Sequence, residues 1–272
     1  MTFNSENQLP AAARLPTLEK LEAVRILGVQ VHLLTVEQLI NQMADMIDRN
    51  CHSLILNVNV HCMNLAYQHV WLRNYLNQAS IVFCDGVGVM LGARLLGFRI
   101  PQRFTPADWL WQLGKFVEPR GYSLYLLGAR PGVAKRAAEN LKAKYPGLRI
   151  LGYSDGYFDK TPGSLANETV LREINRCKPN ILILGFGMPL QEKWLLENWD
   201  RVDANIALSA GAVFDYISGN LRRAPRWMTD HGLEWLGRLI IEPQRLWKRY
   251  LIGNPLFLWR IVKQRLGLLD LY

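Results

Sequence analysis

From about residue 21 to residue 221, the chain repeats one pattern of hydrophobic and polar positions, without a fixed period. Each repeat begins with a short apolar run, passes through a loop rich in Gly, Asn or Asp, and continues with apolar residues at helical spacing. The apolar runs include SLIL, SIVF, SLYLL, ILIL and NIAL. Uninterrupted apolar runs are typical of strands buried on both faces. The pattern therefore predicts an α/β fold with a Rossmann-like, largely parallel sheet flanked by helices.

Finer features of this pattern predict where several elements begin and end. VRILGVQVHLLT is expected to form a strand or hairpin, VEQLINQMADMIDRN a helix, and residues 63–78 another helix. Pro131 is expected in the first turn of a helix that ends near Gly147. Residues 1–20 are polar, and we expect them to form a mobile leader before an α/β domain over residues 21–221.

The loops that follow the apolar runs are where a ligand is expected to bind. In open parallel sheets, ligands lie beyond the carboxyl ends of the strands, where loops meet helix N-termini. Several of these loops are rich in glycine, which suits the approach of a phosphate to backbone N–H groups. The loops are Asn57–His61, Asp85–Gly88, Gly128–Gly132, Gly185–Gln191 and Ser209–Ala212.

Positive charge is concentrated toward the C-terminus. The 272 residues include 32 Lys or Arg and 23 Asp or Glu, a formal net charge of +9. Residues 222–272 hold ten of the basic residues and four of the acidic ones, so this segment carries +6 and the first 221 residues only +3. The same segment contains a set of aromatic residues: Trp227, Trp235, Trp247, Tyr250, Phe257, Trp259 and Tyr272.

Two interpretations of residues 222–272 remain open from the residues alone. Cations alternate with apolar residues from Gly232 to Leu251, and again after a predicted break at Gly253-Asn254-Pro255, as in amphipathic helices at a membrane interface. The pattern also fits a helical hairpin packed on the body with its charges in water. Nucleic acid binding is disfavoured, because the chain has no zinc-finger spacing, RNP-type strand or long Lys/Arg run.

Several classes of protein are disfavoured by what the sequence lacks. The four cysteines are scattered and never form CxxC, which argues against a disulfide scaffold. Neither a full GxGxxG nor GxxxxGK[ST] is present, which argues against NAD enzymes and P-loop ATPases. Asp-x-Asp, with which many nucleotide-sugar transferases hold a metal, is also absent, and we expect no metal and no other cofactor. Without a long apolar run or a signal peptide, a cytoplasmic location is expected.

Asp85 is the most suggestive carboxylate. It follows the apolar run IVFC and precedes Gly86, so we expect it to point into the ligand crevice, where a partly buried carboxylate can act as a general base. The alternative is a cap on the following helix, which position alone slightly favours. Arg103 and the run Arg222-Arg223-Ala-Pro-Arg226 could bind diphosphate groups, because guanidinium groups match phosphate oxygens. Solvated arginines at turns are the alternative for both.

Taken together, the ordered motifs resemble the WecG/TagA/CpsF family of bacterial glycosyltransferases. They are FCDGVGV, the stretch Arg103–Asp108, YLLGARPGVAKRAAENL, LGFGMPLQEKW and ALSAGAVFDYISGNLRRAPRWMTDHGLEWLGRLIIEPQRLWKRY. The resemblance implies transfer of a sugar from a UDP-sugar to an undecaprenyl-diphosphate-linked sugar in surface polysaccharide synthesis, with inversion and without a metal. It also implies that residues 222–272 are a basic amphipathic helical appendage, which docks on the anionic inner face of the cell membrane and helps to close the active site.

The resemblance also implies roles for individual residues. Asp85 matches the family's proposed base for the acceptor hydroxyl. The residues matched to donor or acceptor binding are Asn57, Asn59, Arg103, Gly128, Gly132, Gly187, Gln191, Arg223 and Arg226. Two positions depart from the family pattern: Asn57 stands where Thr is common, and Pro106 stands where Gly is expected. The donor sugar therefore stays open among N-acetylmannosamine, its uronic acid, glucose and others.

Two hypotheses from other classes remain beside this one. A non-catalytic scaffold would bind a nucleotide sugar without turnover. A soluble α/β enzyme would use residues 222–272 to dimerise, burying the Trp-rich faces between the two subunits of a homo-oligomer. The first hypothesis predicts UDP binding without product, and the second predicts a dimer that is indifferent to lipid.

Overall fold

The structure is a computed structural model that describes residues 21–104, 106–221, 225–230 and 232–269. The leader expected over residues 1–20 lies outside these described residues. The strands are β1 (Ala23–Ile26), β2 (Val29–His32), β3 (Ser53–Val58), β4 (Ile81–Cys84), β5 (Ser123–Gly128), β6 (Arg149–Ser154), β7 (Ile181–Gly185) and β8 (Ile206–Ser209). The helices of the body are α1 (Val36–Asp48), α2 (Val60–Gln68), α3 (Val70–Gln78), α4 (Val87–Leu95), α5 (Pro106–Val117), α6 (Val133–Lys144), α7 (Leu165–Cys177), α8 (Leu190–Asn198), η1 (Trp199–Arg201) and α9 (Val213–Ile217). The C-terminal segment holds α10 (Arg226–Asp230), α11 (Glu234–Ile241), α12 (Pro243–Trp247), the π-helical η2 (Lys248–Ile252) and α13 (Gly253–Arg265).

Six strands form one parallel sheet in the order β4-β3-β8-β7-β5-β6, and β1 and β2 form a separate antiparallel hairpin. The strands β3, β4, β5, β7 and β8 are buried along their whole length. Their sequences therefore lack the alternation of a half-exposed strand. The α/β fold predicted from the apolar runs is confirmed. All six carboxyl ends meet at one edge of the sheet.

Helices cover both faces of the sheet and create two hydrophobic cores. On one face lie buried residues of α1, α5, α6 and α9. On the other lie the β1–β2 hairpin together with α2, α3, α4, α7, α8 and α13. Successive strand residues point to opposite faces, so Leu54 and Leu56 of β3 join one core and Ile55 joins the other.

Three element boundaries differ from those predicted. The helix expected over residues 63–78 is two helices, because the extended backbone of His69 ends α2 and begins α3. Pro131 precedes α6 instead of lying in its first turn, because Gly132 adopts a left-handed conformation that no helical residue can share. The break expected at Gly253-Asn254-Pro255 is absent, since the chain runs from η2 directly into α13. The wider π turn before Pro255 accommodates a residue that has no N–H to donate.

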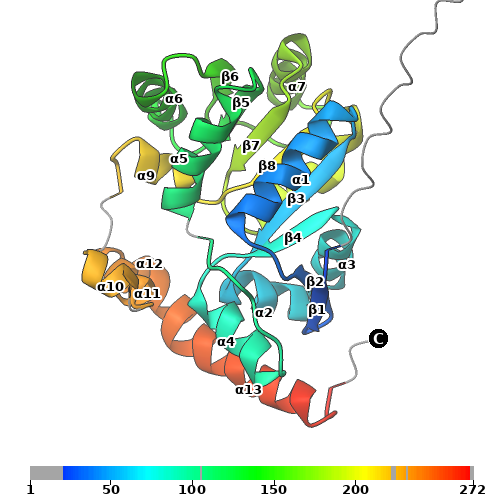
Figure 1. Cartoon of the computed structure of the whole chain (residues 1–272), viewed down its shortest axis with the longest axis vertical. Coiled ribbons are helices and arrows are strands. Elements are labelled where there is room, and N and C mark those ends of the chain that lie inside the picture. The colour runs from blue at the N-terminus through cyan, green and yellow to red at the C-terminus, as the bar shows by residue number, and fades with distance from the viewer. Residues whose placement is uncertain (1–20, 105, 222–224, 231, 270–272) are drawn as a thin grey trace, which may run out of the picture.

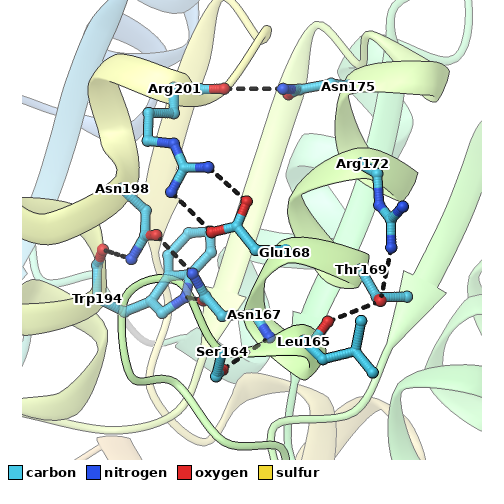
Figure 2. A network of polar contacts seen from close by, with 10 residues as sticks. All are labelled: Ser164, Leu165, Asn167, Glu168, Thr169, Arg172, Asn175, Trp194, Asn198 and Arg201. Carbon is cyan, nitrogen blue, oxygen red and sulfur yellow. Dashed lines mark hydrogen bonds and ion pairs between the residues drawn. The ribbon is translucent and has the colours of Figure 1, made fainter.

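A polar network holds α8 against α7 (Figure 2). The indole Nε1 of Trp194 donates to Asn167 Oδ1 over 2.8 Å. The Nδ2 of Asn167 in turn donates to Asn198 Oδ1, also over 2.8 Å. Asn167 and Asn198 are buried, and buried amides that are fully bonded specify one arrangement of the surrounding elements. At the surface, both guanidinium NH groups of Arg201 reach the Glu168 carboxylate. The network fixes α8, whose first turn carries two residues of the site described below.

The C-terminal segment ends in α13, which packs along the body below α2 and α4 (Figure 1). Phe257 and Ile261 are fully buried there, and a Cβ on Gly92 of α4 would lie 2.8 Å from the Phe257 ring. The guanidinium of Arg260, also buried, donates to Asn64 Oδ1 over 2.7 Å. The segment is therefore joined to the core, as the hairpin interpretation predicted for one of its faces.

The opposite face of α13 is apolar and exposed. Trp259, Val262 and Leu266 lie at helical spacing with 57%, 39% and 64% of their surface exposed, and we call these three residues the outward stripe. The apolar side chains of Leu251 and Ile252 continue it into η2. No helix of the described ranges has both the length and the apolar character needed to cross a membrane.

Candidate functional site

Three neighbouring strands each place a polar side chain at the carboxyl edge of the sheet. Asp85 follows β4, Asn57 lies near the end of β3, and Ser209 ends β8. The Asn57 Nδ2 donates to Asp85 Oδ2 over 3.3 Å, and the Ser209 hydroxyl donates to Asn57 Oδ1 over 2.7 Å. Because these strands are adjacent in the order β4-β3-β8, residues far apart in the sequence form one continuous polar row.

Asp85 is held in place by backbone pairing on two sides. Its N–H donates to Val58 O over 2.8 Å, and the residue forms a parallel bridge with Phe104. The N-cap of α4 is Gly86, with a φ of 100° and no side-chain cap. The capping role that position alone favoured for Asp85 is therefore wrong: the extra glycine turns the chain into the helix, and the carboxylate stays at the strand end.

The surroundings of Asp85 favour a carboxyl group that titrates near neutrality. Removal from water, followed by the negative charge of Glu234, raises the pKa of Asp85 to about 6. Positive charge on Arg249, a hydrogen bond from the Asn59 side chain and positive charge on Arg238 act in the opposite direction on that pKa. A carboxylate that is half-buried and titrates close to the working pH suits a general base.

Asn59, the N-cap of α2, forms hydrogen bonds both to its own helix and to Asp85. Its Oδ1 accepts from the Cys62 N–H over 3.1 Å and caps the helix. The hydrogen bond that its side chain makes to Asp85 then comes from the amide NH₂ group. Asn57 lies below the surface, with 2% of its area exposed, whereas Asn59 is half-buried. The structure thus brings both asparagines to Asp85.

Two arginines of the C-terminal segment lie close enough to Asp85 for their charges to act on it. The positive charges of Arg238 in α11 and Arg249 in η2 both act on Asp85. Both side chains are half-buried, and neither Nε has a hydrogen-bond partner among the described residues. Burial lowers the pKa of Arg249, and it lowers the pKa of His61 in the first turn of α2 to about 4, an effect to which Arg249 contributes. Sequence reasoning treated these arginines as part of a charged segment and did not assign them to the site, although both lie within the matched motif GLEWLGRLIIEPQRLWKRY.

Gln191 and Glu192 are buried in the first turn of α8. Gln191 Oε1 accepts from the Gly211 N–H over 3.2 Å, and its Nε2 donates to Glu192 Oε1 over 2.8 Å. Gln191 therefore links the loop after β8 to α8. The other carboxylate oxygen of Glu192 has no hydrogen-bond partner in the part of the chain that the structure describes, and burial raises the pKa of this group to about 7. Glu192 was not predicted, because its sequence gives no sign that it is buried.

The predicted glycines lie farther along the sheet edge from Asp85. Gly187 follows β7 with a φ of 83°, and Gly128 ends β5, where a Cβ would lie 2.5 Å from the Gly185 carbonyl carbon. Gly132 lines a cavity of about 380 Å³ with Lys135, Ser154 and Phe158, beside β6. Two strands, β3 and β8, separate β4 from β7, and β7 also separates β4 from β5. The glycines occupy the other half of the same edge.

The structure describes the three predicted arginines to different extents. Arg103 is half-buried and precedes Phe104, whose bridge to Asp85 brings this loop beside the carboxylate. Arg223 lies outside the described residues, and Arg226 is described only by its backbone, as the first residue of α10. Within the described ranges, no group of three or more His, Cys, Asp or Glu side chains is arranged to hold a metal ion.

Comparison with known proteins gives one consistent result. The sequence profile of the family described as "Glycosyl transferase WecG/TagA/CpsF family" matches residues 24–270. A protein of Bacillus subtilis (strain 168) is 31% identical over 222 residues, covering 80% of this chain and 82% of the relative. A protein of Staphylococcus aureus (strain NCTC 8325 / PS 47) is 27% identical over 246 residues, covering 89% and 93%. Both relatives are named N-acetylglucosaminyldiphosphoundecaprenol N-acetyl-beta-D-mannosaminyltransferase.

Proposed function

This chain belongs to the WecG/TagA/CpsF family of glycosyl transferases, and we propose that it transfers an N-acetylmannosamine-like sugar from a UDP-sugar to a sugar linked to undecaprenyl diphosphate. The names of the two relatives supply the acceptor class and the type of sugar. The observation that carries the proposal is Asp85, a half-buried carboxylate at a strand end with a pKa of about 6 and with amide and guanidinium groups around it.

In the proposed reaction, Asp85 takes the proton of the acceptor hydroxyl. The hydroxyl oxygen attacks the anomeric carbon from the face opposite the diphosphate, a new C–O bond forms, and the bond to the leaving UDP breaks with its electron pair on UDP. One displacement of this kind inverts the anomeric centre. A base with a pKa of about 6 is mostly ionised at pH 7 and is ready to accept that proton.

Arginines are proposed to stabilise the leaving diphosphate without a metal ion. Arg238 and Arg249 converge on the Asp85 side of the site, and their Nε groups lack partners among the described residues. Arg103, beside the Asp85 bridge, is a third candidate, and Arg223 and Arg226 stay predictions from the resemblance. A guanidinium fork matches phosphate oxygens and concentrates positive charge where negative charge develops.

The donor nucleotide is proposed to lie along the sheet edge, away from Asp85. Gly132 and Gly187 leave room for a phosphate or ribose to approach the backbone, and the cavity beside Gly132 adjoins the same loops. Gly128 packs against the backbone of Gly185, and its proposed contact with the donor stays a prediction from the resemblance. Gln191 is proposed to hold the loop after β8 in the form that closes this region, through its bond to Gly211. The sugar would then bridge the two halves of the edge.

Residues 222–272 are proposed to bind the surface of an anionic membrane, on its cytoplasmic side. The outward stripe provides apolar side chains, and Arg245 of α12 and Lys248 of η2 are exposed in the same C-terminal segment. Apolar residues and cations together suit an interface that presents acyl chains and anionic headgroups. An enzyme bound there would meet an acceptor whose lipid lies in the same membrane.

The test is a panel of radiolabelled UDP-sugars with a polyprenyl-diphosphate-linked N-acetylglucosamine acceptor, run with and without EDTA. We expect a labelled lipid product with UDP-N-acetylmannosamine, of inverted configuration by NMR, and equal rates in both conditions. A scaffold would bind UDP and give no product with any donor. Loss of turnover in EDTA that added Mg²⁺ restores would contradict metal independence.

A further inference from the structure

Ser209, Asn57 and Asp85 form a directional chain of hydrogen bonds across three strands. The backbone N–H of Asn57 donates to the Ser209 Oγ over 2.8 Å, and the Ser209 hydroxyl donates to Asn57 Oδ1 over 2.7 Å. The Asn57 Nδ2 then donates to Asp85 Oδ2 over 3.3 Å. Each donor in this chain has one acceptor, and the last acceptor is the carboxylate.

The Ser209 hydroxyl decides which way the amide of Asn57 points. The hydroxyl proton is directed to the amide oxygen, so the amide NH₂ group faces Asp85. In the reversed amide the Ser209 Oγ would accept from the NH₂ group, and its own buried proton would lose this acceptor. The reversed amide would place its oxygen against the carboxylate. Two acceptors would then face each other, an arrangement that only a protonated Asp85 could satisfy.

We propose that Ser209 is a positioning residue that fixes the amide of Asn57, and that Asn57 thereby holds Asp85 in the ionised form that accepts a proton. This inference rests on the proposed role of Asp85 as the base. It assigns Asn57 to the orientation of Asp85, where the family resemblance assigned it to donor or acceptor binding.

The burial of the two residues supports a positioning role. Ser209 has none of its surface exposed and Asn57 has 2%, so neither can contact a ligand without a rearrangement of the strands. The side-chain NH₂ and C=O groups of Asn57 also already form hydrogen bonds, to Asp85 and with Ser209. The other titratable groups that act on or around Asp85 come from several elements: Cys62 of α2, Cys84 of β4, Tyr216 of α9, Glu234 and Arg238 of α11, and Arg249 of η2.

Ser209→Ala releases the amide of Asn57 and lets the protonated form of Asp85 persist to higher pH. The acid limb of the kcat/KM profile is the fall of kcat/KM at low pH, and it reports the protonation of Asp85. Its midpoint should therefore move from about pH 6 to a higher pH, by about 0.5 to 1 pH unit. Turnover should fall several-fold at pH 6 and little at pH 8, while KM for donor and acceptor stays within about twofold. Ser209→Thr keeps the hydroxyl and should keep the acid limb of the wild type.

A second Ser–Asn pair in the same sheet, with Ser123 buried and Asn180 half-buried, provides a control. At the amino ends of β5 and β7, the Ser123 hydroxyl donates to Asn180 Oδ1 over 3.0 Å, and the Asn180 N–H donates to Ser123 Oγ over 3.1 Å. This pair has the same two hydrogen bonds, and in addition the Ser123 N–H donates to Asn180 Oδ1 over 2.9 Å. It lies at the opposite edge from Asp85. Ser123→Ala should lower the melting temperature as much as Ser209→Ala does and leave the pH profile unchanged.

The experiment measures kcat and KM from pH 5 to 9 for the wild type, Ser209→Ala, Ser209→Thr, Asn57→Ala and Ser123→Ala, with melting temperatures for each. Asn57→Ala removes the donor that Ser209 orients and leaves Asp85 with the Asn59 amide as a donor. The acid limb should therefore move to higher pH in this variant, even if Ser209→Thr fails to fold. An acid limb that stays in place in both Ser209→Ala and Asn57→Ala overturns the positioning role. A rise in KM without a shift of the limb also overturns it, in favour of substrate contact.

Asp85→Asn separates this inference from the proposed function. If Asp85→Asn is inactive and the limb of Ser209→Ala does not move, Asp85 remains the base and only the positioning role fails. If Asp85→Asn keeps wild-type turnover, the base assignment fails, and the positioning role fails with it.

Discussion

The carboxyl edge of the sheet and the C-terminal segment contribute to one site in opposite ways. At the sheet edge, amides and a hydroxyl lie near two carboxylates, Asp85 and Glu192. Strand pairing holds the first in place, and the packing of α8 holds the second. The C-terminal segment carries most of the net positive charge, contributes Arg238 and Arg249 to the site, and exposes apolar side chains on its outer face. The sheet supplies precise placement, and the segment supplies charge and an external surface.

This difference shows why the two regions must be in contact for the site to be complete. Without the C-terminal segment, Asp85 would lose all three charged neighbours that act on its pKa, the anion Glu234, which raises it, and the cations Arg249 and Arg238, which lower it. Without the sheet, those arginines would have no carboxylate and no fixed crevice to face. The junction is built by α13, whose Phe257 packs against Gly92 of α4.

The largest expected effect is on the sheet side, at Asp85 itself. Asp85→Asn removes the proton acceptor and should lower kcat by about 100- to 10,000-fold while donor binding changes little. Radiolabel transfer and UDP-sugar binding by calorimetry measure the two quantities. Asp203→Asn is the control, because it removes only an exposed ion pair with Lys178, 2.8 Å long, and should leave both quantities unchanged. Wild-type turnover in Asp85→Asn would refute the base assignment.

The next effect tests the outer face of the C-terminal segment. Replacing Trp259, Val262 and Leu266 of the outward stripe by Ser should weaken binding to phosphatidylglycerol vesicles by about tenfold or more, because three exposed apolar side chains no longer enter the interface. Flotation measures the bound fraction. The matched control is Leu165→Ser with Leu196→Ser, which removes exposed apolar side chains from α7 and α8. Equal loss in both variants would mean that binding is non-specific, and a concentration-dependent dimer without vesicle binding would support dimerisation instead.

A third effect concerns the free energy of unfolding of the protein and its dependence on the buried carboxyl of Glu192. Burial raises the pKa of this carboxyl from 4.5 to about 7, so folding favours its protonated form. The resulting destabilisation of the wild type is absent below pH 4.5, grows as the pH rises from 4.5 to 7, and is complete above pH 7. Glu192→Gln should therefore raise the free energy of unfolding by about 1–3 kcal/mol at pH 8 and hardly at all at pH 4.5.

Denaturant unfolding at the two pH values checks this prediction for Glu192. Glu139→Gln, at an exposed position of α6, is the control and should change stability by less than about 0.5 kcal/mol at either pH. A stability gain of Glu192→Gln that is the same at pH 4.5 and pH 8 would mean that the charge of Glu192 is not its cause.

The smallest effect tests the inner face of the C-terminal segment. Arg249 lowers the pKa of Asp85. Arg249→Gln should therefore move the midpoint of the acid limb of kcat/KM from near pH 6 to a higher pH, by about half a pH unit to one pH unit. Rates should fall more at pH 6 than at pH 8. Arg172→Gln removes an exposed cation of α7 and should leave the limb in place. A loss of equal size at both pH values, with an unmoved limb, would assign Arg249 to phosphate binding alone.

The sequence by itself determined the fold class, because short apolar runs without alternation, each followed by a helical pattern, are typical of a parallel sheet covered on both faces. It also placed Asp85 and Asn57 at the carboxyl edge of the sheet, since each follows such a run and parallel strands share their carboxyl ends. Their contact depends on β3 and β4 being neighbours. The uneven distribution of charge was likewise visible in the composition of residues 222–272.

Only the tertiary structure decided which groups surround Asp85. Hydrophobic periodicity could not separate a capping role from a base, because that choice depended on Gly86 taking the cap position. It could not place Ser209 beside Asn57, since β8 is inserted next to β3 from 152 residues away. Nor could it show that Arg249 lies at the site, because the uninterrupted passage from η2 into α13 sets that position. Local pattern fixes which elements form, and long-range packing fixes which side chains meet.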